Sequence, residues 1–210
     1  MTQPRLLVCG FGAFPAAPRN PSAAAIEALA AQGWSAPGVA VDFLTLPVSW
    51  TNTIPLILDA VRARPADGIL VVGVATTADA FRVETLGRNK ASRTLVDHDG
   101  APGPGPLISA DGPGVIAATA PVSLMLDAII RANLAARLSD DAGDYLCNFT
   151  LYGLLAAAAA PAVGFLHVPQ ARECADGASF DLADIEKAVR ASAAAFAAAL
   201  SRPDASRRTA

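Results

Sequence analysis

The chain has 210 residues, a length that suits a single domain with a core of ordinary size. Its formal net charge is −3, its pI is about 5.3 and it has no block of basic residues, so neither nucleic acid nor an anionic membrane is an expected partner. Its three cysteines are an odd number without a Cys-x-x-Cys spacing, which argues against both a disulfide framework and a zinc site.

Strand-like and helix-like segments alternate along the first third of the chain. Short runs rich in Val, Leu and Ile predict strands, and segments that follow a capping residue such as Asn20 predict helices. In chain order we expect a strand over 5–9, a helix over 23–32, a strand over 39–46, a helix from 51 or 52 to 64, and a strand over 68–74. This alternation predicts an α/β fold, a three-layer α/β/α sandwich around a mostly parallel, twisted sheet.

The middle of the chain is less regular. A strand is expected over 80–86 and carries Glu84. After it the periodicity disappears over 87–114, where clusters of Gly and Pro mark turns. A loop of this length inside a compact domain is often functional, so we expect a lid or specificity loop here, or else a mobile segment.

The last third returns to regular elements. In chain order we expect a helix over 121–136, a helix over 149–160, a strand over 163–169 and a final helix over 180–200. Residues 201–210 are polar and are expected to form a disordered tail. Residues 1–200 would then form one domain.

We expect neither a membrane span nor export. The mean hydropathy is +0.39, and residues 149–166 form an uncharged stretch about long enough to cross a bilayer. Pro161 and Gly164 divide that stretch into a helix and a strand, which argues against a span. Nothing at the N-terminus resembles a signal peptide, so the reducing cytoplasm is the expected location.

One cysteine has the surroundings of a nucleophile. Cys147 lies between an extended approach that starts at Gly143 and a helix-like run. The free N–H groups and the dipole of a helix N-terminus favour negative charge, so a cysteine in the first turn tends to ionise below the free-thiol pKa of about 8.5. The same N–H groups could hold the oxyanion of a tetrahedral intermediate, so this segment could supply both nucleophile and oxyanion site.

A nucleophile needs a base, and the base needs a residue that orients it. Of the two histidines, His167 lies at the end of an apolar, strand-like run, and Glu84 lies in an upstream strand. Sites in open α/β sheets gather at the carboxyl ends of strands, where these residues could meet Cys147. Each residue also has a structural interpretation: a packed cysteine, a core histidine, and a surface glutamate paired with Arg82 or Arg88.

Five short motifs occur in order along the chain. They are Gly10-Phe-Gly-Ala-Phe14 with Asn20-Pro-Ser22, Leu46-Pro-Val48, Val83-Glu84 with Asn89, the segment 142–148 around the cysteine, and the segment 165–169 around the histidine. In this order they resemble the pyroglutamyl peptidase I family, cysteine peptidases that remove an N-terminal pyroglutamate from peptides. The resemblance extends from about Leu6 to Val168, nearly the whole chain.

The resemblance implies a role for each motif residue. Cys147 would be the nucleophile, His167 the base, and Glu84 the residue that orients and charges the base. The substrate-binding residues that it implies are Phe11 and Phe14, which would flank the pyroglutamyl ring, and Asn20, Val74 and Arg93. It implies one catalytic domain over residues 1–200, no metal and no cofactor. Family members often form homodimers or homotetramers.

The sequence departs from the family pattern in its expected substrate loops. Gly12 and Pro15-Ala16 stand where family members often have Glu and a Gly pair, and residues 74–77 differ from the bacterial pattern. The family's Arg-Ile-Pro-Asp-Asn-x-Gly loop appears over 93–100, where it is one residue longer, with Arg93 displaced by one position and His98 in the place of the Asn. These differences bear on substrate affinity and leaving-group preference rather than on the three catalytic candidates.

The implied reaction is acyl transfer through a thioester. A thiolate at Cys147 would attack the carbonyl after pyroglutamate, His167 would protonate the leaving amine, and water would release pyroglutamate. Two alternatives stay open because the loops differ. The chain could be a thiol amidohydrolase that acts on another small cyclic or blocked amide, or a non-catalytic domain that retains the fold.

Overall fold

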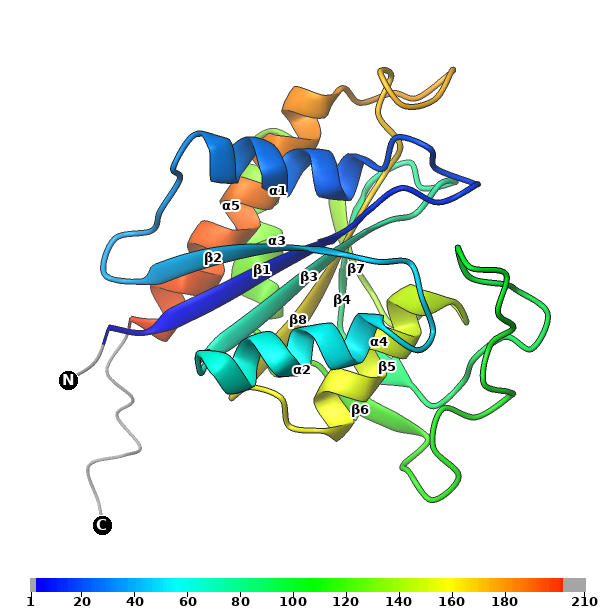
Figure 1. The fold of residues 1–210 in the computed structure, drawn as a ribbon. Helices are drawn as coiled ribbons and strands as arrows, with labels where there is room; N and C mark the ends of the chain where they lie inside the picture. The colour runs from blue at the N-terminus through cyan, green and yellow to red at the C-terminus, as the bar shows by residue number, and fades with distance from the viewer. Residues whose placement is uncertain (1–2, 202–210) are drawn as a thin grey trace, which may run out of the picture.

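The computed structural model describes residues 3–201, and its centre is a six-stranded sheet (Figure 1). The strands of this sheet, in chain order, are β1 (Arg5–Phe11), β2 (Ala40–Leu46), β3 (Gly68–Val74), β4 (Phe81–Glu84), β7 (Ala136–Ser139) and β8 (Ala162–Val168). Their order across the sheet is β2-β1-β3-β8-β4-β7. All neighbours pair in parallel except β4 and β8, which are antiparallel, so the expected mostly parallel sheet is confirmed.

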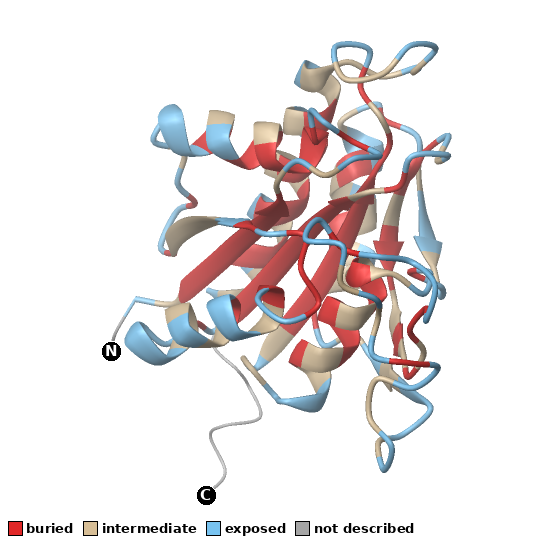
Figure 2. Cartoon of the chain, turned by 45° about the vertical axis from the view of Figure 1, so that its right-hand side comes forward, coloured by how far each residue is buried: buried red, intermediate tan, exposed pale blue. Residues whose placement is uncertain are grey.

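Helices cover both faces of this sheet. Three of them lie on one face, α1 (Pro21–Ala31), α3 (Val122–Arg131) and α5 (Leu182–Leu200), and two lie on the other, α2 (Thr53–Ala63) and α4 (Leu146–Ala156) (Figure 1). Figure 2 shows the resulting burial pattern, with buried strands between helices whose outer sides are exposed. The predicted three-layer α/β/α architecture is therefore confirmed.

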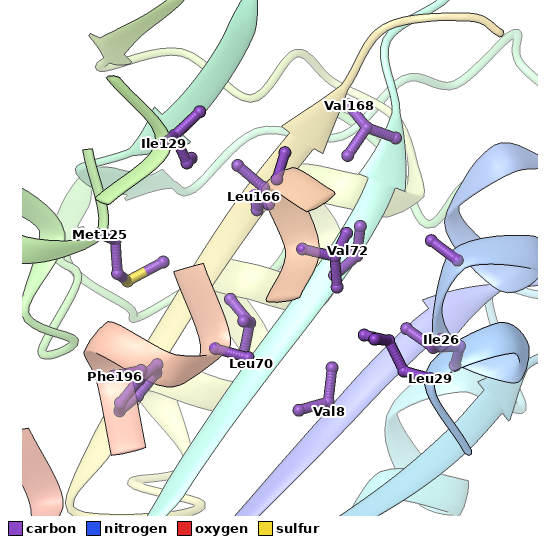
Figure 3. Packing of buried hydrophobic residues seen from close by; sticks show 14 of the residues in the cluster. Val8, Ile26, Leu29, Leu70, Val72, Met125, Ile129, Leu166, Val168 and Phe196 are labelled. Atoms are coloured by element: carbon purple, nitrogen blue, oxygen red, sulfur yellow. The ribbon is translucent and has the colours of Figure 1, made fainter. Parts of the chain in front are cut away.

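The larger core lies between the sheet and the three-helix layer (Figure 3). Val72 and Leu166 from the strands and Ile129 from α3 belong to this core, and all three side chains are fully buried. The ring of Phe196, from α5, lies against two glycines of the sheet. A Cβ on Gly68 would come within 2.9 Å of that ring and one on Gly164 within 3.7 Å, so the absence of side chains there makes room for it.

The helix expected over 121–136 was too long. It ends at Arg131, because Asn133 adopts a left-handed conformation with φ 58° and turns the chain back toward the sheet. The chain then forms β7, the edge strand that pairs with β4. Its four residues, Ala-Arg-Leu-Ser, do alternate, but so short a run does not stand out as a strand in the sequence.

Two other boundaries differ from expectation. The helix α4 begins at Leu146, three residues earlier than predicted, so Cys147 belongs to its first turn. The strand expected over 80–86 is divided after Glu84. Its second part is β5 (Leu86–Arg88), which pairs with β6 (Val115–Ala117) in a separate two-stranded sheet.

The segment expected to be irregular contains no helix or strand between β5 and β6, apart from one isolated bridge between Val96 and Pro102. The predicted tail lies outside the described residues, except for Ser201. No helix within residues 3–201 combines the length and apolar character needed to span a bilayer.

We expect Phe196→Ala to lower the free energy of unfolding by about 3–5 kcal/mol, because it leaves a cavity above two glycines that have no side chains to fill it. Ile130→Ala, at a half-exposed position of α3, is the control and should change that energy by less than about 0.5 kcal/mol. Denaturant unfolding of both variants checks the difference. Equal losses would contradict the proposed packing role of Phe196.

Candidate active site

Three elements bring the candidate catalytic residues to one end of the sheet. Glu84 is the last residue of β4, His167 is the penultimate residue of β8, and Cys147 is the second residue of α4. The antiparallel pairing of β4 with β8 places Glu84 opposite Phe165, two residues from His167. Side chains two residues apart on a strand share a face, so the carboxylate can reach the ring diagonally across the pair.

The carboxylate and the imidazole are in direct contact. Glu84 Oε1 lies 2.7 Å from His167 Nδ1, and the two residues are 0% and 3% exposed. Because water does not compete at this depth, the hydrogen bond can fix the ring with Nδ1 as donor. The other ring nitrogen, Nε2, is then free to accept a proton. The alternative of a surface Glu84 is wrong, since the residue is fully buried and Arg88 pairs instead with Asp140 at 3.1 Å.

Charge and hydrogen bonding determine the protonation of His167. Burial on its own would lower the pKa of the ring, because it disfavours the imidazolium. The Cys147 side chain opposes this by charge and by a hydrogen bond, and Glu84 does the same. Together they raise the pKa of His167 from 6.5 to about 9. The imidazolium is therefore the favoured form of His167 at neutral pH.

The sulfur of Cys147 lies where β3 has no side chain. A Cβ placed on Gly73 would come within 2.9 Å of Cys147 Sγ and 2.8 Å of the Phe165 ring. The thiol is half-buried and belongs to the first turn of α4. The N-cap residue of this helix, Tyr145, makes no side-chain capping hydrogen bond. The first N–H groups of a helix have no intrahelical acceptor, so they can receive a ligand beside this sulfur.

Two adjoining cavities meet at Cys147. A cleft of about 880 Å³ is lined by Cys147 and His167 together with Arg82 and the loop residues Val96 and Tyr145, among others. A smaller, mainly apolar cavity is lined by Cys147 and four of the predicted substrate-binding residues, Phe11, Phe14, Asn20 and Val74. The fifth predicted residue, Arg93, is exposed and is not among the residues that line either cavity.

Asn20 supports this smaller cavity through its own hydrogen bonds. Its Oδ1 accepts from Ser22 N at 3.1 Å, which caps α1, and its Nδ2 donates to Gly12 O at 2.9 Å. The amide therefore joins the start of α1 to the loop that follows β1. That loop carries Phe14, which is half-buried and lines both cavities, whereas Phe11 is buried in the core.

Sequence reasoning missed the residue that shapes the long loop. Asp97 is 3% exposed, and its carboxylate accepts hydrogen bonds from the backbone N–H groups of Trp50, Asp99 and Ala101 at 2.9–3.0 Å. Burial would raise the pKa of this carboxyl, but these donors hold it below its ordinary value. The pattern Asp97-His-Asp-Gly100 is typical of an Asx turn and is the signal that could have indicated this role.

Aromatic residues connect the same loop to the start of α4. Tyr145 donates from its hydroxyl to Val96 O at 2.9 Å, and its ring lies 5.2 Å from that of Trp50 in an edge-on arrangement. The loop therefore closes one side of the cleft. Tyr145, two residues before Cys147, lines both cavities.

The described residues offer no alternative metal centre. Among residues 3–201, no group of three or more His, Cys, Asp or Glu side chains is arranged to hold an ion. The cysteines of this part of the chain are Cys9, Cys147 and Cys174, and all three are free. Burial raises the pKa of the Cys9 thiol far above its usual value, so Cys9 is a packed, unreactive residue.

Known structures share this fold. Pyroglutamyl peptidase I from Bacillus amyloliquefaciens superposes with a TM-score of 0.83 at 26% identity, over 93% of this chain and 97% of that one. Pyrrolidone carboxyl peptidase from Thermococcus litoralis superposes with a TM-score of 0.83 at 22% identity, over 92% and 93%. At 22% identity, the similarity to the Thermococcus litoralis structure shows a shared fold and nothing about function.

Known sequences agree with the structural comparison. The pyrrolidone-carboxylate peptidase of Streptomyces coelicolor is 33% identical over 173 residues, which cover 80% of this chain and 79% of the relative. That of Streptococcus pyogenes is 26% identical over 195 residues, which cover 89% of each. The family model described as pyroglutamyl peptidase matches residues 4–202, so the chain belongs to the pyroglutamyl peptidase family.

Proposed function

We propose that this chain is a cysteine peptidase that hydrolyses the amide bond after an N-terminal pyroglutamyl residue. Cys147 is the nucleophile, His167 the base and then the acid, and Glu84 the residue that orients His167. The observation that carries the proposal is the buried 2.7 Å contact between His167 Nδ1 and Glu84 Oε1, beside a thiol in the first turn of a helix. Membership of the family supports the choice of substrate.

The reaction begins with the ion pair of thiolate and imidazolium. Cys147 Sγ attacks the carbonyl carbon of the pyroglutamyl group, and the oxygen becomes an oxyanion. Free N–H groups in the first turn of α4 stabilise that charge, since the helix has no side-chain cap at Tyr145. The substrate carbonyl is therefore activated by the same turn that carries the nucleophile.

Collapse of this intermediate requires a proton on the leaving nitrogen. His167 donates it from Nε2, the C–N bond breaks, and the amine leaves a thioester on Cys147. A water molecule then gives a proton to the neutral imidazole and attacks the thioester, which releases pyroglutamate and regenerates the thiolate beside the imidazolium. Glu84 holds the ring in one tautomer through both steps and stabilises its charged form.

The lining of the smaller cavity suits the chemistry of the pyroglutamyl ring, and its walls must move apart to admit the ring, because the cavity holds only about 30 Å³ in this structure. Phe11, Phe14 and Val74 supply apolar walls, and the flat lactam has no charged amine that would need a carboxylate partner. An ordinary N-terminus carries an ammonium group, and burying it in this cavity without a partner would cost several kcal/mol on the scale of unpaired buried charges. The cavity should therefore exclude peptides with a free amino terminus.

We also propose that residues 1–200 work as one catalytic domain in a reducing compartment such as the cytoplasm. The support is chemical: a thiolate that is open to a cleft oxidises readily, and a reducing environment keeps it as a nucleophile.

Cys147→Ala should abolish turnover, and His167→Ala should lower kcat by about 10²–10⁴-fold or more, because each removes a group that takes part in bond making. Glu84→Gln should leave measurable activity, since it removes only the orienting charge. Cys174→Ala, which changes a free cysteine outside both cavities, is the control for the cysteine variant. Circular dichroism establishes that each variant is folded. Full activity of folded Cys147→Ala or His167→Ala would end the assignment.

The pH profile should report the charge on His167. The imidazolium is the active form, and the pKa of about 9 means that kcat/KM should fall as the pH rises through about 9. Glu84→Gln removes one of the causes that raise this pKa, so its alkaline limb should lie at lower pH. Measuring kcat/KM across a pH range that brackets 9 checks both statements. An alkaline limb that does not move in Glu84→Gln would show that the carboxylate does not act on the ring.

Substrate choice separates this function from a broader amidase activity. A fluorogenic pyroglutamyl amide should be hydrolysed much faster than its prolyl analogue, which has a charged ring nitrogen, and than its acetyl analogue, which has no ring to fill the cavity. The release of the fluorophore gives the rates directly. Comparable rates on the acetyl analogue would favour a thiol amidohydrolase for small blocked amides. No turnover of any of the three would favour a non-catalytic domain.

A further inference from the structure

One positive charge in the cleft is not used by the proposed chemistry. Arg82 is the only Lys or Arg among the described residues that line the cleft with Cys147 and His167. It lies on β4 directly opposite His167 in the antiparallel pair with β8. Opposed residues of such a pair point to the same face, so the arginine stands beside the catalytic ring.

The guanidinium of Arg82 makes only long-range contacts with acidic groups, a 3.9 Å ion pair with Glu84 and a weaker electrostatic interaction with Asp79. Its Nε is buried and has no hydrogen-bond partner within residues 3–201. Its contact with Glu84 Oε1 is 3.9 Å long, beyond hydrogen-bond distance. Two neighbouring arginines at this end of the sheet are paired, since Arg88 contacts Asp140 at 3.1 Å and Arg137 contacts Asp79 at 2.8 Å. Arg82 is 27% exposed and therefore available from the cleft.

The aspartates that line the cleft are either paired with other groups or exposed to solvent. Asp97 lines the cleft but accepts three backbone hydrogen bonds, and Asp141 pairs with Lys90 at 2.8 Å. Asp144 also lines the cleft and is exposed, where solvent screens its charge. A buried donor without a partner is costly, so the Arg82 guanidinium is a site for an incoming acceptor.

The course of the reaction shows which part of the substrate would face this arginine. The pyroglutamyl ring occupies the cavity on the Phe14 side of Cys147, and His167 protonates the leaving nitrogen. The residue after pyroglutamate must therefore lie beside His167 in the larger cleft, toward β4. In a dipeptide the α-carboxylate is only two bonds from that nitrogen, which places it near the position of Arg82.

We propose that Arg82 binds the α-carboxylate of the residue that follows pyroglutamate, so that pyroglutamyl dipeptides with a free C-terminus are the preferred substrates. This inference rests on the proposed function and adds the substrate class. A planar guanidinium matches a carboxylate with two parallel hydrogen bonds, an interaction that an amidated or longer peptide cannot offer at this place. Arg82 thereby selects substrates by their leaving amino acid.

The test compares pyroglutamyl-alanine with pyroglutamyl-alanine amide on the purified full chain. The quantity of interest is the ratio of kcat/KM for the acid to kcat/KM for the amide. Arg82→Gln should lower that ratio by about tenfold or more, because it removes one charge-assisted hydrogen-bonded pair. The change should come mainly from a higher KM for the acid. Arg82→Lys should restore part of the ratio, because it keeps the charge without the planar fork.

Arg137→Gln is the matched control. Arg137 lies on the neighbouring strand β7 but is paired with Asp79, so its removal should leave the ratio unchanged. An unchanged ratio in Arg82→Gln would overturn the inference. If kcat/KM falls equally for the acid and the amide, so that the ratio stays the same, Arg82 acts through Glu84 instead. Failure of the proposed function has a different signature from failure of this inference: the unmodified protein would hydrolyse neither these peptides nor the fluorogenic pyroglutamyl amide.

Discussion

The buried hydrogen bond between Glu84 and His167 is the interaction on which the rest of the site depends. A carboxylate without solvent is costly, and here one of its oxygens is satisfied by a ring that can itself carry positive charge. The second oxygen, Oε2, has no hydrogen-bond partner among the described residues. The contact between Glu84 and His167 is thus favourable mainly when the ring is protonated. Because Cys147 also raises the pKa of this ring, the charge of the base is coupled to that of the thiol.

The reversal of one strand makes this contact possible. Four strands of the sheet run in parallel and would bring only their carboxyl ends to the site, whereas β4 runs against β8 and lies beside it in register. Glu84 and Arg82 therefore both reach the face of the sheet that His167 occupies. The short β7 completes this arrangement by pairing with β4, which keeps β4 from being an exposed edge.

The sequence predicted what depends on local pattern and missed what depends on pairing. The central strands and their alternation with helices followed from continuous apolar runs, as with β3, and the cysteine and histidine motifs indicated residues that the structure brings close together. Local pattern could not show that β4 is antiparallel, because strand direction follows from tertiary pairing rather than from residue type. The Ala136–Ser139 strand was missed because it is short, and the role of Asp97 because its donors come from a distant segment as well as from its own loop.

The glycine behind the sulfur has a further consequence for the order of events. The main chain of β3 at Gly73 forms a wall against one side of Cys147 Sγ. With the pyroglutamyl group of the proposed thioester in the smaller cavity, the thioester carbonyl is approached from the open cleft. The departing amine and the arriving water must use this one opening in turn. In the proposed mechanism this wall imposes a double displacement, in which the first product leaves before the second reactant enters.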